Sequence, residues 1–410
     1  KIANLRVIEA AEFKFQPGFT LIVGVNGVGK TSVLDALSIS LSPVVKHVNR
    51  LRTTRDFSSD DIRVGANALT VECGIEIDRE EFNYLVHKPR ELSVPRQKTA
   101  GMPRLQTHVT PAKSEFMGRT PRLATDSQAD GRPFAVFFGT RRAVPTDRSP
   151  SKGSAAGGIQ AALAEALNDR RLRLLEFAEW IQVQESMRRE RSAAGRVLAA
   201  FEDAVTRFLP GYSNLRVDRG KPPRLLIDRG RTTLDVRQLS DGERGALAMV
   251  LDLTRRIAQA NPRMATPAST AEAVVLIDEL DLHLHPTWQH TIARNLRATF
   301  PKCQFIATTH SPQIVASVEP EQIALLTKVG VSYPDRSLGL DSNWILRHLM
   351  GSDDRPEDAA KAIQVVEALI RKGSLKKARA AIAGAKKKGL DLPEWSMFEA
   401  RMARLEGIAK

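Results

Sequence analysis

The sequence predicts an α/β fold with a central, mostly parallel sheet. Three observations indicate this class. An apolar run, 19–23, leads through a glycine-rich stretch directly into a helical pattern. A second run, 273–277, is the most apolar short run of the chain and is followed by carboxylates, which is typical of a central parallel strand. A strand pattern over 303–308 follows a helical pattern over 287–300, which completes a βαβ unit.

The composition is that of a folded, basic protein. The 410 residues include 61 Lys+Arg and 47 Asp+Glu, a formal net charge of +14, and 42% are hydrophobic, which excludes a wholly disordered chain. We expect no membrane partner, because no apolar run is long enough to span a bilayer. The two cysteines, Cys73 and Cys303, are too few for a disulfide framework and suggest a cytoplasmic protein. The basic excess favours a polyanion partner, or is simply a solvated surface.

The remaining elements follow in chain order. Strands are expected at the start of the chain, at 69–77 and at 134–138. Apolar residues alternate over 69–77, so Cys73 is expected to be a small core side chain. Between 69–77 and 134–138, the proline-rich segment 88–122 holds eight basic and two acidic residues, and a basic loop insertion is expected there. Helical periodicity over 159–208 predicts a helical lobe at about 159–210.

The C-terminal part of the chain is predicted to be helical. Three helices are expected at 356–372, 375–388 and 393–408. We therefore expect a first domain over 1–333 and a small helical module over 334–410.

The segment 24–31 reads Gly-Val-Asn-Gly-Val-Gly-Lys-Thr and fits the phosphate-binding P-loop pattern, between a strand and a helix. Backbone N–H groups freed by the glycines, together with the start of the helix, bind phosphate oxygens. Lys30 is expected to reach the β- and γ-phosphates of ATP, and the Thr31 hydroxyl to ligate Mg²⁺. The ATP-binding candidates in this segment are Gly24, Asn26, Gly27, Gly29, Lys30, Thr31 and Ser32.

Two carboxylates follow the apolar strand 273–277 and fit a Walker B motif. Carboxylates at the end of a central parallel strand lie where ligands bind, at the edge of the sheet that carries the P-loop. Asp278 is expected to hold Mg²⁺, and Glu279 to orient or deprotonate the water that attacks the γ-phosphate.

The segment 239–243, Leu-Ser-Asp-Gly-Glu, resembles the signature motif of ABC-type ATPases, commonly Leu-Ser-Gly-Gly-Gln. Its Asp and Glu resemble the form found in the SMC, RecF and OLD-like branch. Downstream, Thr-Thr-His-Ser at 308–311 resembles the switch histidine, here His310. The four motifs occur once each and in the family order, and the resemblance covers about residues 1–330.

This resemblance implies the ABC form of the P-loop NTPase fold, with an antiparallel β subdomain and a helical lobe beside the central sheet. It also implies a composite site in a homodimer. Ser240, Gly242 and Glu243 of one protomer would contact the γ-phosphate of ATP bound to the other. His310 would sense that phosphate, and hydrolysis would release the dimer. Asp281 would make a contact between subunits.

The segment 278–286 resembles the Asp-Glu-Pro-Glu-x-His-Leu-His-Pro stretch of the same branch, but has Leu280 and Asp281 where that pattern has Pro and Glu. His283 and His285 could be metal ligands; their loose spacing favours a structural loop. A Q-loop glutamine is not identifiable, although Asp60 and Asp61 lie in about the right region. Residues 137–142 resemble a Tyr-Gly-x-x-Arg stretch, with no chemistry evident from the sequence.

The gap between P-loop and signature lacks sustained heptads, which excludes a long-armed chromosome machine. Residues 341–346 and 350–356 resemble bacterial stand-alone ATPases that accompany nucleases in Septu-type and retron-linked anti-phage systems. This implies an ATP-driven dimer that binds or senses DNA and controls an effector, an HNH-type nuclease. The alternatives are a RecF-like repair ATPase and a nucleotide-gated scaffold with negligible turnover. Segments 88–122 and 371–388 are candidate nucleic-acid or partner surfaces, or solvated faces.

Overall fold

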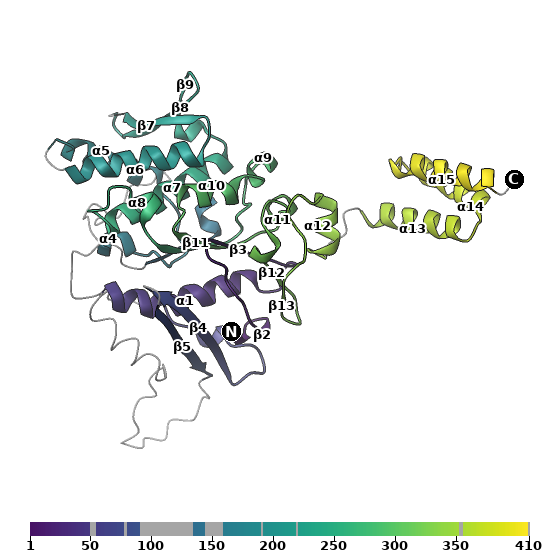
Figure 1. The fold of residues 1–410 in the computed structure, drawn as a ribbon, viewed down its shortest axis with the longest axis horizontal. Helices are drawn as coiled ribbons and strands as arrows, with labels where there is room; N and C mark the ends of the chain where they lie inside the picture. Colours follow the sequence, from purple (N-terminus) through teal and green to yellow (C-terminus); the bar gives the residue numbers. More distant parts are fainter. Residues whose placement is uncertain are drawn as a thin grey trace, which may run out of the picture. The chain divides into compact units, whose positions relative to one another are not determined.

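The structure is a computed structural model that describes residues 1–49, 55–77, 80–90, 134–143, 159–189, 192–218, 220–351 and 356–408. These residues form two compact units, 1–345 and 346–410 (Figure 1). Most of the predicted basic loop 88–122 lies outside the described residues, and residues 88 and 89 belong to the end of a strand. In the described part of the chain, no helix is both long and apolar enough to cross a membrane.

The first unit is built on a six-stranded sheet whose order is β13-β12-β3-β11-β10-β6 among the described residues. All neighbours in it pair in parallel except β12 and β13. Both β3 and β10 are central, as their continuous apolar runs predict. The strands are β3 (Phe19–Val23), β6 (Ala135–Phe138), β10 (Ala273–Ile277), β11 (Cys303–Thr308), β12 (Ile323–Leu326) and β13 (Val331–Ser332).

Two antiparallel sheets accompany the central sheet. The four-stranded sheet has the order β2-β1-β4-β5, and the three-stranded sheet the order β7-β8-β9. Cys73 lies in β4 and is buried, as the alternation predicts. The strands are β1 (Ile2–Leu5), β2 (Ile8–Ala11), β4 (Ala68–Ile77), β5 (Glu80–Pro89), β7 (Tyr212–Asp218), β8 (Arg224–Arg229) and β9 (Thr232–Asp235).

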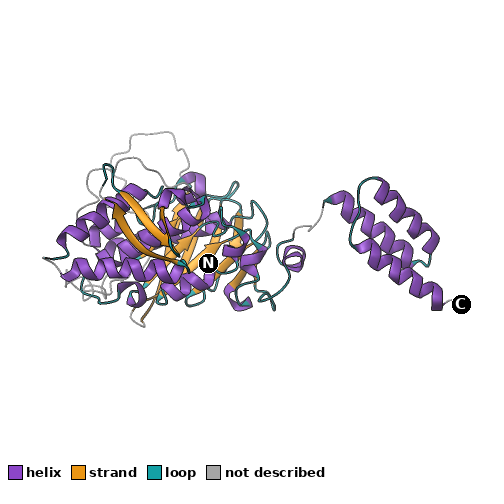
Figure 2. Cartoon of the chain, turned by 90° about the horizontal axis from the view of Figure 1, so that it is seen from above, coloured by secondary structure: helices purple, strands orange, loops and turns teal. Residues whose placement is uncertain are grey.

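Helices cover these sheets (Figure 2). Helix α1 packs against β6, β10 and β11 of the central sheet and against β4 of the four-stranded sheet, so it lies between the two. Helix α7 packs against α4, α5 and α6. The helices of this unit are α1 (Lys30–Asn49), α4 (Ile159–Leu163), α5 (Leu174–Met187), α6 (Ser192–Phe208), α7 (Asp241–Ala260), α8 (Pro267–Thr270), α9 (Pro286–Gln289), α10 (Ile292–Thr299) and α11 (Pro312–Val315), followed by α12 (Ser342–His348), which spans the division between the units.

In the described part of the second unit, three helices share an apolar core of their own. They are α13 (Glu357–Arg371), α14 (Leu375–Lys387) and α15 (Glu394–Ile408), each within a residue or so of its predicted bounds. Val366, Ile382, Trp395 and Phe398 are buried in the core that they share. The Trp395 indole nitrogen donates to the Leu390 carbonyl at 2.7 Å, which closes the turn between α14 and α15.

The structure differs from the sequence predictions in three places. The expected helix 287–300 is interrupted between α9 and α10. Strands β5, β7, β12 and β13 were not predicted. The units divide after residue 345 rather than after residue 333, because the intervening segment is tied to the first unit. There the Ser337 hydroxyl donates to the Val318 carbonyl and the Gly339 N–H to the Ala316 carbonyl, both at 2.8 Å.

Candidate functional site

The P-loop connects the end of β3 to the start of α1. Gly27 and Gly29 have φ values of +77° and +106°, which L side chains rarely adopt, so the loop requires glycine at both positions. Gly24 is required by close approach, because a Cβ there would lie 2.4 Å from the Leu326 carbonyl oxygen of β12. The loop is therefore shaped by its own backbone and by the neighbouring strand.

Lys30 begins α1 and is 7% exposed. Its Nζ donates to the Gly24 carbonyl at 2.8 Å and to the Val25 carbonyl at 3.2 Å, so the ammonium lies inside the loop. Burial lowers the pKa of Lys30, although the carboxylates of the 278–281 segment act in the opposite direction. The cation is thus held within the loop that the sequence assigns to phosphate.

Asp278, at the end of β10, is 3% exposed and accepts hydrogen bonds on both carboxylate oxygens. The Thr31 hydroxyl donates to Oδ2 at 2.9 Å, and the Thr308 hydroxyl donates to Oδ1 at 2.6 Å. Residues 247 positions apart therefore place a hydroxyl and a carboxylate side by side. Hard oxygen donors of this kind are the ligands that Mg²⁺ prefers, so the donor set fits that ion.

Glu279 follows Asp278 with φ of +48°, a left-handed conformation that is unusual for a residue with a side chain. Its N–H donates to the Thr308 hydroxyl oxygen at 2.7 Å. Its carbonyl accepts a hydrogen bond of 2.7 Å from the Arg142 guanidinium. The backbone on both sides of Glu279 is therefore held from β11 and from the end of β6.

Asp281 and His310 are joined at the carboxyl end of β11. Asp281 Oδ1 accepts hydrogen bonds from the Thr309 hydroxyl at 2.5 Å and from the His310 N–H at 3.0 Å. Asp281 is thus bound within its own chain, and its expected contact with a second subunit stays a prediction. His285 Nδ1 lies 3.3 Å from the Thr287 N–H, which it caps at the start of α9, in line with the structural interpretation of this loop.

The signature segment begins helix α7, with Ser240 as its exposed N-cap. Ser240 Oγ accepts from the Glu243 N–H, while one Glu243 carboxylate oxygen accepts from the Ser240 N–H and hydroxyl, which is a capping box. The Tyr212 hydroxyl donates to the other Glu243 oxygen at 2.8 Å. These bonds from Ser240 and Tyr212 lower the pKa of Glu243 against the raising effect of its burial.

Gly242 is buried against the loop that follows the Walker B residues. A Cβ on Gly242 would lie 2.2 Å from the His283 carbonyl oxygen, so this position admits only glycine. The first turn of α7 therefore rests on residues 283–284 of the same chain. Among the described residues, the recorded side-chain hydrogen bonds of Ser240 and Glu243 run to each other and to Tyr212, and not to the P-loop.

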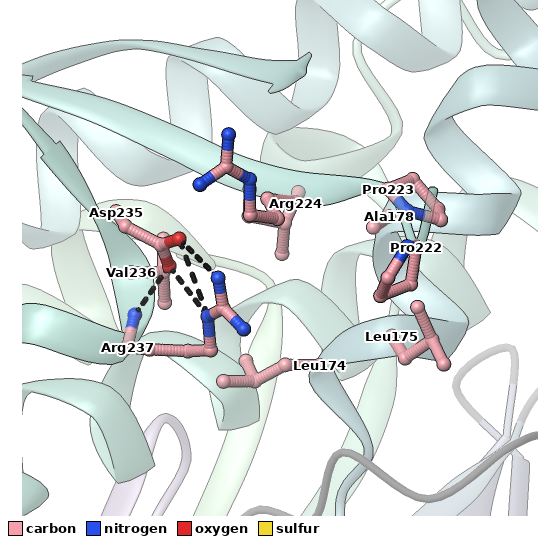
Figure 3. A pocket seen from close by; sticks show the side chains of 10 residues that line it. Leu174, Leu175, Ala178, Pro222, Pro223, Arg224, Asp235, Val236 and Arg237 are labelled. Carbon is pink, nitrogen blue, oxygen red and sulfur yellow. Dashed lines mark hydrogen bonds and ion pairs between the residues drawn. The ribbon is translucent and has the colours of Figure 1, made fainter. Parts of the chain in front are cut away.

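Two cavities of different size bear on ligand binding. A cavity of about 260 Å³ adjoins the P-loop and is lined by residues 7–10 and 25–28 together with Arg63, Thr327 and Lys328. A second, of about 50 Å³, lies between α5 and the β8–β9 region (Figure 3). Because small-molecule sites are typically several hundred Å³, only the first of these two approaches the size that a nucleotide needs.

Several residues of the site had no predicted role. Arg142 contacts the Walker B backbone, and Thr308 holds both Asp278 and Glu279. Both residues lie in stretches with a family resemblance, 137–142 and 308–311, but their partners Asp278 and Glu279 are distant in the sequence, so these roles could not be assigned from the pattern. Asp61 belongs to an ion-pair network, because Arg6 contacts both Asp61 and Asp35, and hydrogen bonds from Ser58 and Arg6 lower the Asp61 pKa despite its burial.

Two family models match the chain. One is described as "AAA domain" and matches residues 1–132. The other is described as "AAA domain, putative AbiEii toxin, Type IV TA system" and matches residues 153–316. Together they cover the segments that carry the P-loop, the signature, the Walker B residues and the switch histidine.

Curated relatives were also found. The chain is 41% identical over 169 residues to the Retron Ec83 probable ATPase of Escherichia coli, covering 41% of this chain and 31% of that protein. It is 23% identical to the Retron Vc95 probable ATPase of Vibrio cholerae, covering 86% and 79%. It is 22% identical to the Septu protein PtuA of Bacillus mycoides, covering 79% and 38%. The match thus spans less than half of two of these relatives.

Among solved structures, the chain is similar to an SMC head bound to the C-terminal winged-helix domain of ScpA. The sequence identity is 16%, the TM-score is 0.46, and the match covers 82% of this chain and 97% of that one.

Proposed function

We propose that the chain is an ABC-type P-loop ATPase, similar to members of the SMC, RecF and OLD-like branch. In this proposal it hydrolyses Mg²⁺-ATP as a homodimer that controls an effector nuclease in anti-phage defence. The observation that carries the ATPase part is the hydrogen bond between Thr31 and Asp278, 2.9 Å long, which brings the P-loop and the Walker B carboxylate into one site. The defence role and the partner are the finer part of the proposal.

In this proposal the P-loop residues of 24–32 bind the phosphates, and Lys30 neutralises their charge. Thr31 and Asp278 would hold Mg²⁺, which supplies charge stabilisation at the phosphate oxygens when bound. Glu279 accepts a proton from the attacking water as the new bond to the γ-phosphorus forms and the bond to ADP breaks. His310, beside Asp281, contacts the γ-phosphate.

The dimer is supported by the exposure of the signature segment. Ser240 is exposed at the start of a helix of 20 residues, a position where backbone N–H groups and a hydroxyl suit an anion. Because the recorded side-chain hydrogen bonds of Ser240 and Glu243 run to each other and to Tyr212, we assign the Ser240 hydroxyl and the backbone of Gly242 and Glu243 to the ATP of a second protomer.

The partner part of the proposal is supported by the relatives and by charge. Relatives named as retron ATPases and as a Septu protein support a defence role. Residues 371–388 hold eight basic and no acidic residue, and Lys376, Lys377, Lys387 and Lys388 are exposed. Such a face suits the phosphates of DNA, so we propose that α14 contributes to DNA sensing.

The test is a pull-down of tagged Glu279→Gln, loaded with ATP, from its native host, with and without nuclease digestion. We expect an ATP-dependent dimer by light scattering and a stoichiometric protein partner that survives digestion. Ser240→Arg in the same background is the control, and we expect it to bind ATP but remain monomeric. A strictly monomeric ATP complex of Glu279→Gln would contradict the composite site. Recovery of DNA alone, lost on digestion, would favour a RecF-like repair role.

A further inference from the structure

Arg142 is a buried arginine behind the Walker B segment. It lies in the 3-10 turn Thr140–Ala143 that follows β6 and is 6% exposed. One guanidinium nitrogen donates to the carbonyls of Phe138, Gly139 and Asp278, at 3.3, 2.8 and 2.5 Å. The other donates to the Glu279 carbonyl at 2.7 Å. A single side chain thus joins the carboxyl ends of β6 and β10.

The acceptors of this cation are unusual for a buried charge. A buried arginine is ordinarily paired with a carboxylate, because removing the charge from water is costly. Every hydrogen bond of Arg142 that the structure records runs instead to a backbone carbonyl. Burial lowers the pKa of Arg142 to about 10, against the opposing effect of nearby carboxylates led by Asp278 and Asp281, so the group stays charged at neutral pH.

The Arg142 side chain adds hydrogen bonds beyond the end of the parallel pairing between β6 and β10. The last residue pair of β6 and β10 is Phe138 with Ile277, and the Asp278 N–H then donates to the Phe138 carbonyl at 2.9 Å. Beyond this point the backbone turns away, and Glu279 adopts its left-handed conformation. Where the pairing of β6 with β10 ends, the Arg142 guanidinium binds the carbonyls of the next two residues, Asp278 and Glu279.

We propose that Arg142 is a positioning residue for ATP hydrolysis, which holds the carbonyls of Asp278 and Glu279 so that the Glu279 carboxylate is presented to the attacking water. The inference rests on the proposed function, in which Glu279 accepts the proton of that water. Arg142 itself contacts no P-loop residue through its recorded hydrogen bonds. Its loss should therefore impair the chemical step and leave the affinity for ATP nearly unchanged.

The neighbouring arginine provides a matched control. The Arg141 side chain is 68% exposed and lies 3.5 Å from Asp169 in an ion pair at the surface. Arg141→Met and Arg142→Met remove the same guanidinium group from adjacent positions. The first group is exposed to solvent, and the second is hydrogen-bonded to the Glu279 carbonyl. Arg142→Lys keeps the charge but loses the two-nitrogen fork that reaches both carbonyls.

The experiment measures kcat and KM for ATP hydrolysis, the Kd for a fluorescent ATP analogue, and the melting temperature of the full-length chain. For Arg142→Lys and Arg142→Met we expect kcat to fall by about 100-fold, the loss typical of a misplaced catalytic group. The Kd and KM should stay within about threefold, and Arg141→Met should match the wild type. Arg142→Lys is expected to recover little of the lost kcat.

Three results would overturn the inference. The first is a folded Arg142→Met with wild-type kcat. The second is a fall in kcat matched by an equal loss of ATP affinity, which would assign Arg142 to nucleotide binding. The third is loss of folding in both Arg142 variants, which would make the residue a support of the whole sheet. If the wild-type protein itself binds the analogue but does not turn over ATP, the proposed function fails instead.

Discussion

The two halves of the proposed ATP site differ in how firmly their own chain holds them. In the P-loop half, Lys30 and Asp278 are buried. Lys30 is hydrogen-bonded to two carbonyls of the P-loop, and Asp278 to the hydroxyls of Thr31 and Thr308. In the signature half, Ser240 is exposed, and its partner Glu243 is only partly buried. The first half is thus preorganised within one chain, whereas the second presents its groups to the outside, as a site completed by a second protomer requires.

The helix that carries the exposed signature half, α7, also contains a buried ion cluster. Helix α7 carries Asp252, which is completely buried and contacts Arg170, Arg255 and Arg256 at 2.5 to 2.7 Å. Arg256 also donates to the carbonyls of Ala162 and Ala164, near α4. The contrast is therefore between a buried ion cluster in the body of the helix and a solvent-facing first turn.

The largest expected effect concerns the P-loop half alone. Lys30→Ala removes the buried ammonium, and we expect the Kd for ATP to rise by about 100-fold or more, the usual loss for a buried charge partner. Equilibrium dialysis or calorimetry with ATP measures it. Lys302→Ala, at an exposed lysine, should bind as the wild type does. Unchanged ATP affinity in Lys30→Ala would refute the P-loop assignment.

The next effect tests the buried ion cluster of α7. Asp252→Asn leaves the buried guanidinium groups of Arg255 and Arg256, and the partly exposed one of Arg170, without their anion. We expect a loss of about 3–5 kcal/mol in the free energy of unfolding, measured with urea. Asp203→Asn, which breaks a partly exposed pair with Arg207, should cost less than about 1 kcal/mol. Similar losses in the two variants would contradict the importance that we give to the buried cluster.

The wild type and Asp252→Asn are also expected to differ in how their stability depends on pH. The arginines hold the pKa of Asp252 well below its usual value, despite the desolvation that acts against them. A depressed native pKa stabilises the folded state above the unfolded pKa of about 3.9 and stops doing so as the pH falls through the native value. The stability difference between wild type and Asp252→Asn should therefore be constant near neutral pH and shrink below about pH 4.

The smallest effect concerns the exposed first turn. Glu243→Gln removes a negative charge beside the proposed phosphate position, while Gln still serves at this position of a capping box. At about 1 kcal/mol for a solvated charge pair, we expect ATP-dependent dimerisation to strengthen by roughly fivefold. Sedimentation in the Glu279→Gln background measures it, with Glu202→Gln, on the exposed face of α6, as the control. A weaker dimer would show that the carboxylate itself contacts the nucleotide or its ion.

The motifs could be predicted because each depends on a short stretch of chain. A glycine-rich loop between an apolar strand and a helix has one favourable backbone path, so residues 24–31 could be placed from spacing alone. The same holds for the α14 and α15 helices, whose apolar periodicity defines their bounds. Strand β5 was missed although Phe82 and Tyr84 alternate toward the interior, because the acidic residues before them obscured the pattern.

The contacts that surround the motifs could not be predicted in this way. Arg142 reaches carbonyls 136 and 137 positions away, and Arg170 reaches Asp252 across 82 positions. Their partners become known only when β6 pairs with β10 and when α7 packs among its neighbouring helices. A buried arginine and a surface arginine such as Arg141 look the same in the sequence, because burial is a property of the packed chain.

Local pattern therefore suffices for the class of fold, the order of the motifs and the P-loop conformation, since these depend on backbone preferences and on apolar spacing over a few residues. Tertiary structure decides which hydroxyl and which guanidinium contact the Walker B residues, where the first unit ends, and which half of the proposed ATP site is exposed. Those features depend on the pairing of distant strands, and hydrogen bonds to buried charges form only where that pairing brings the groups within about 3 Å.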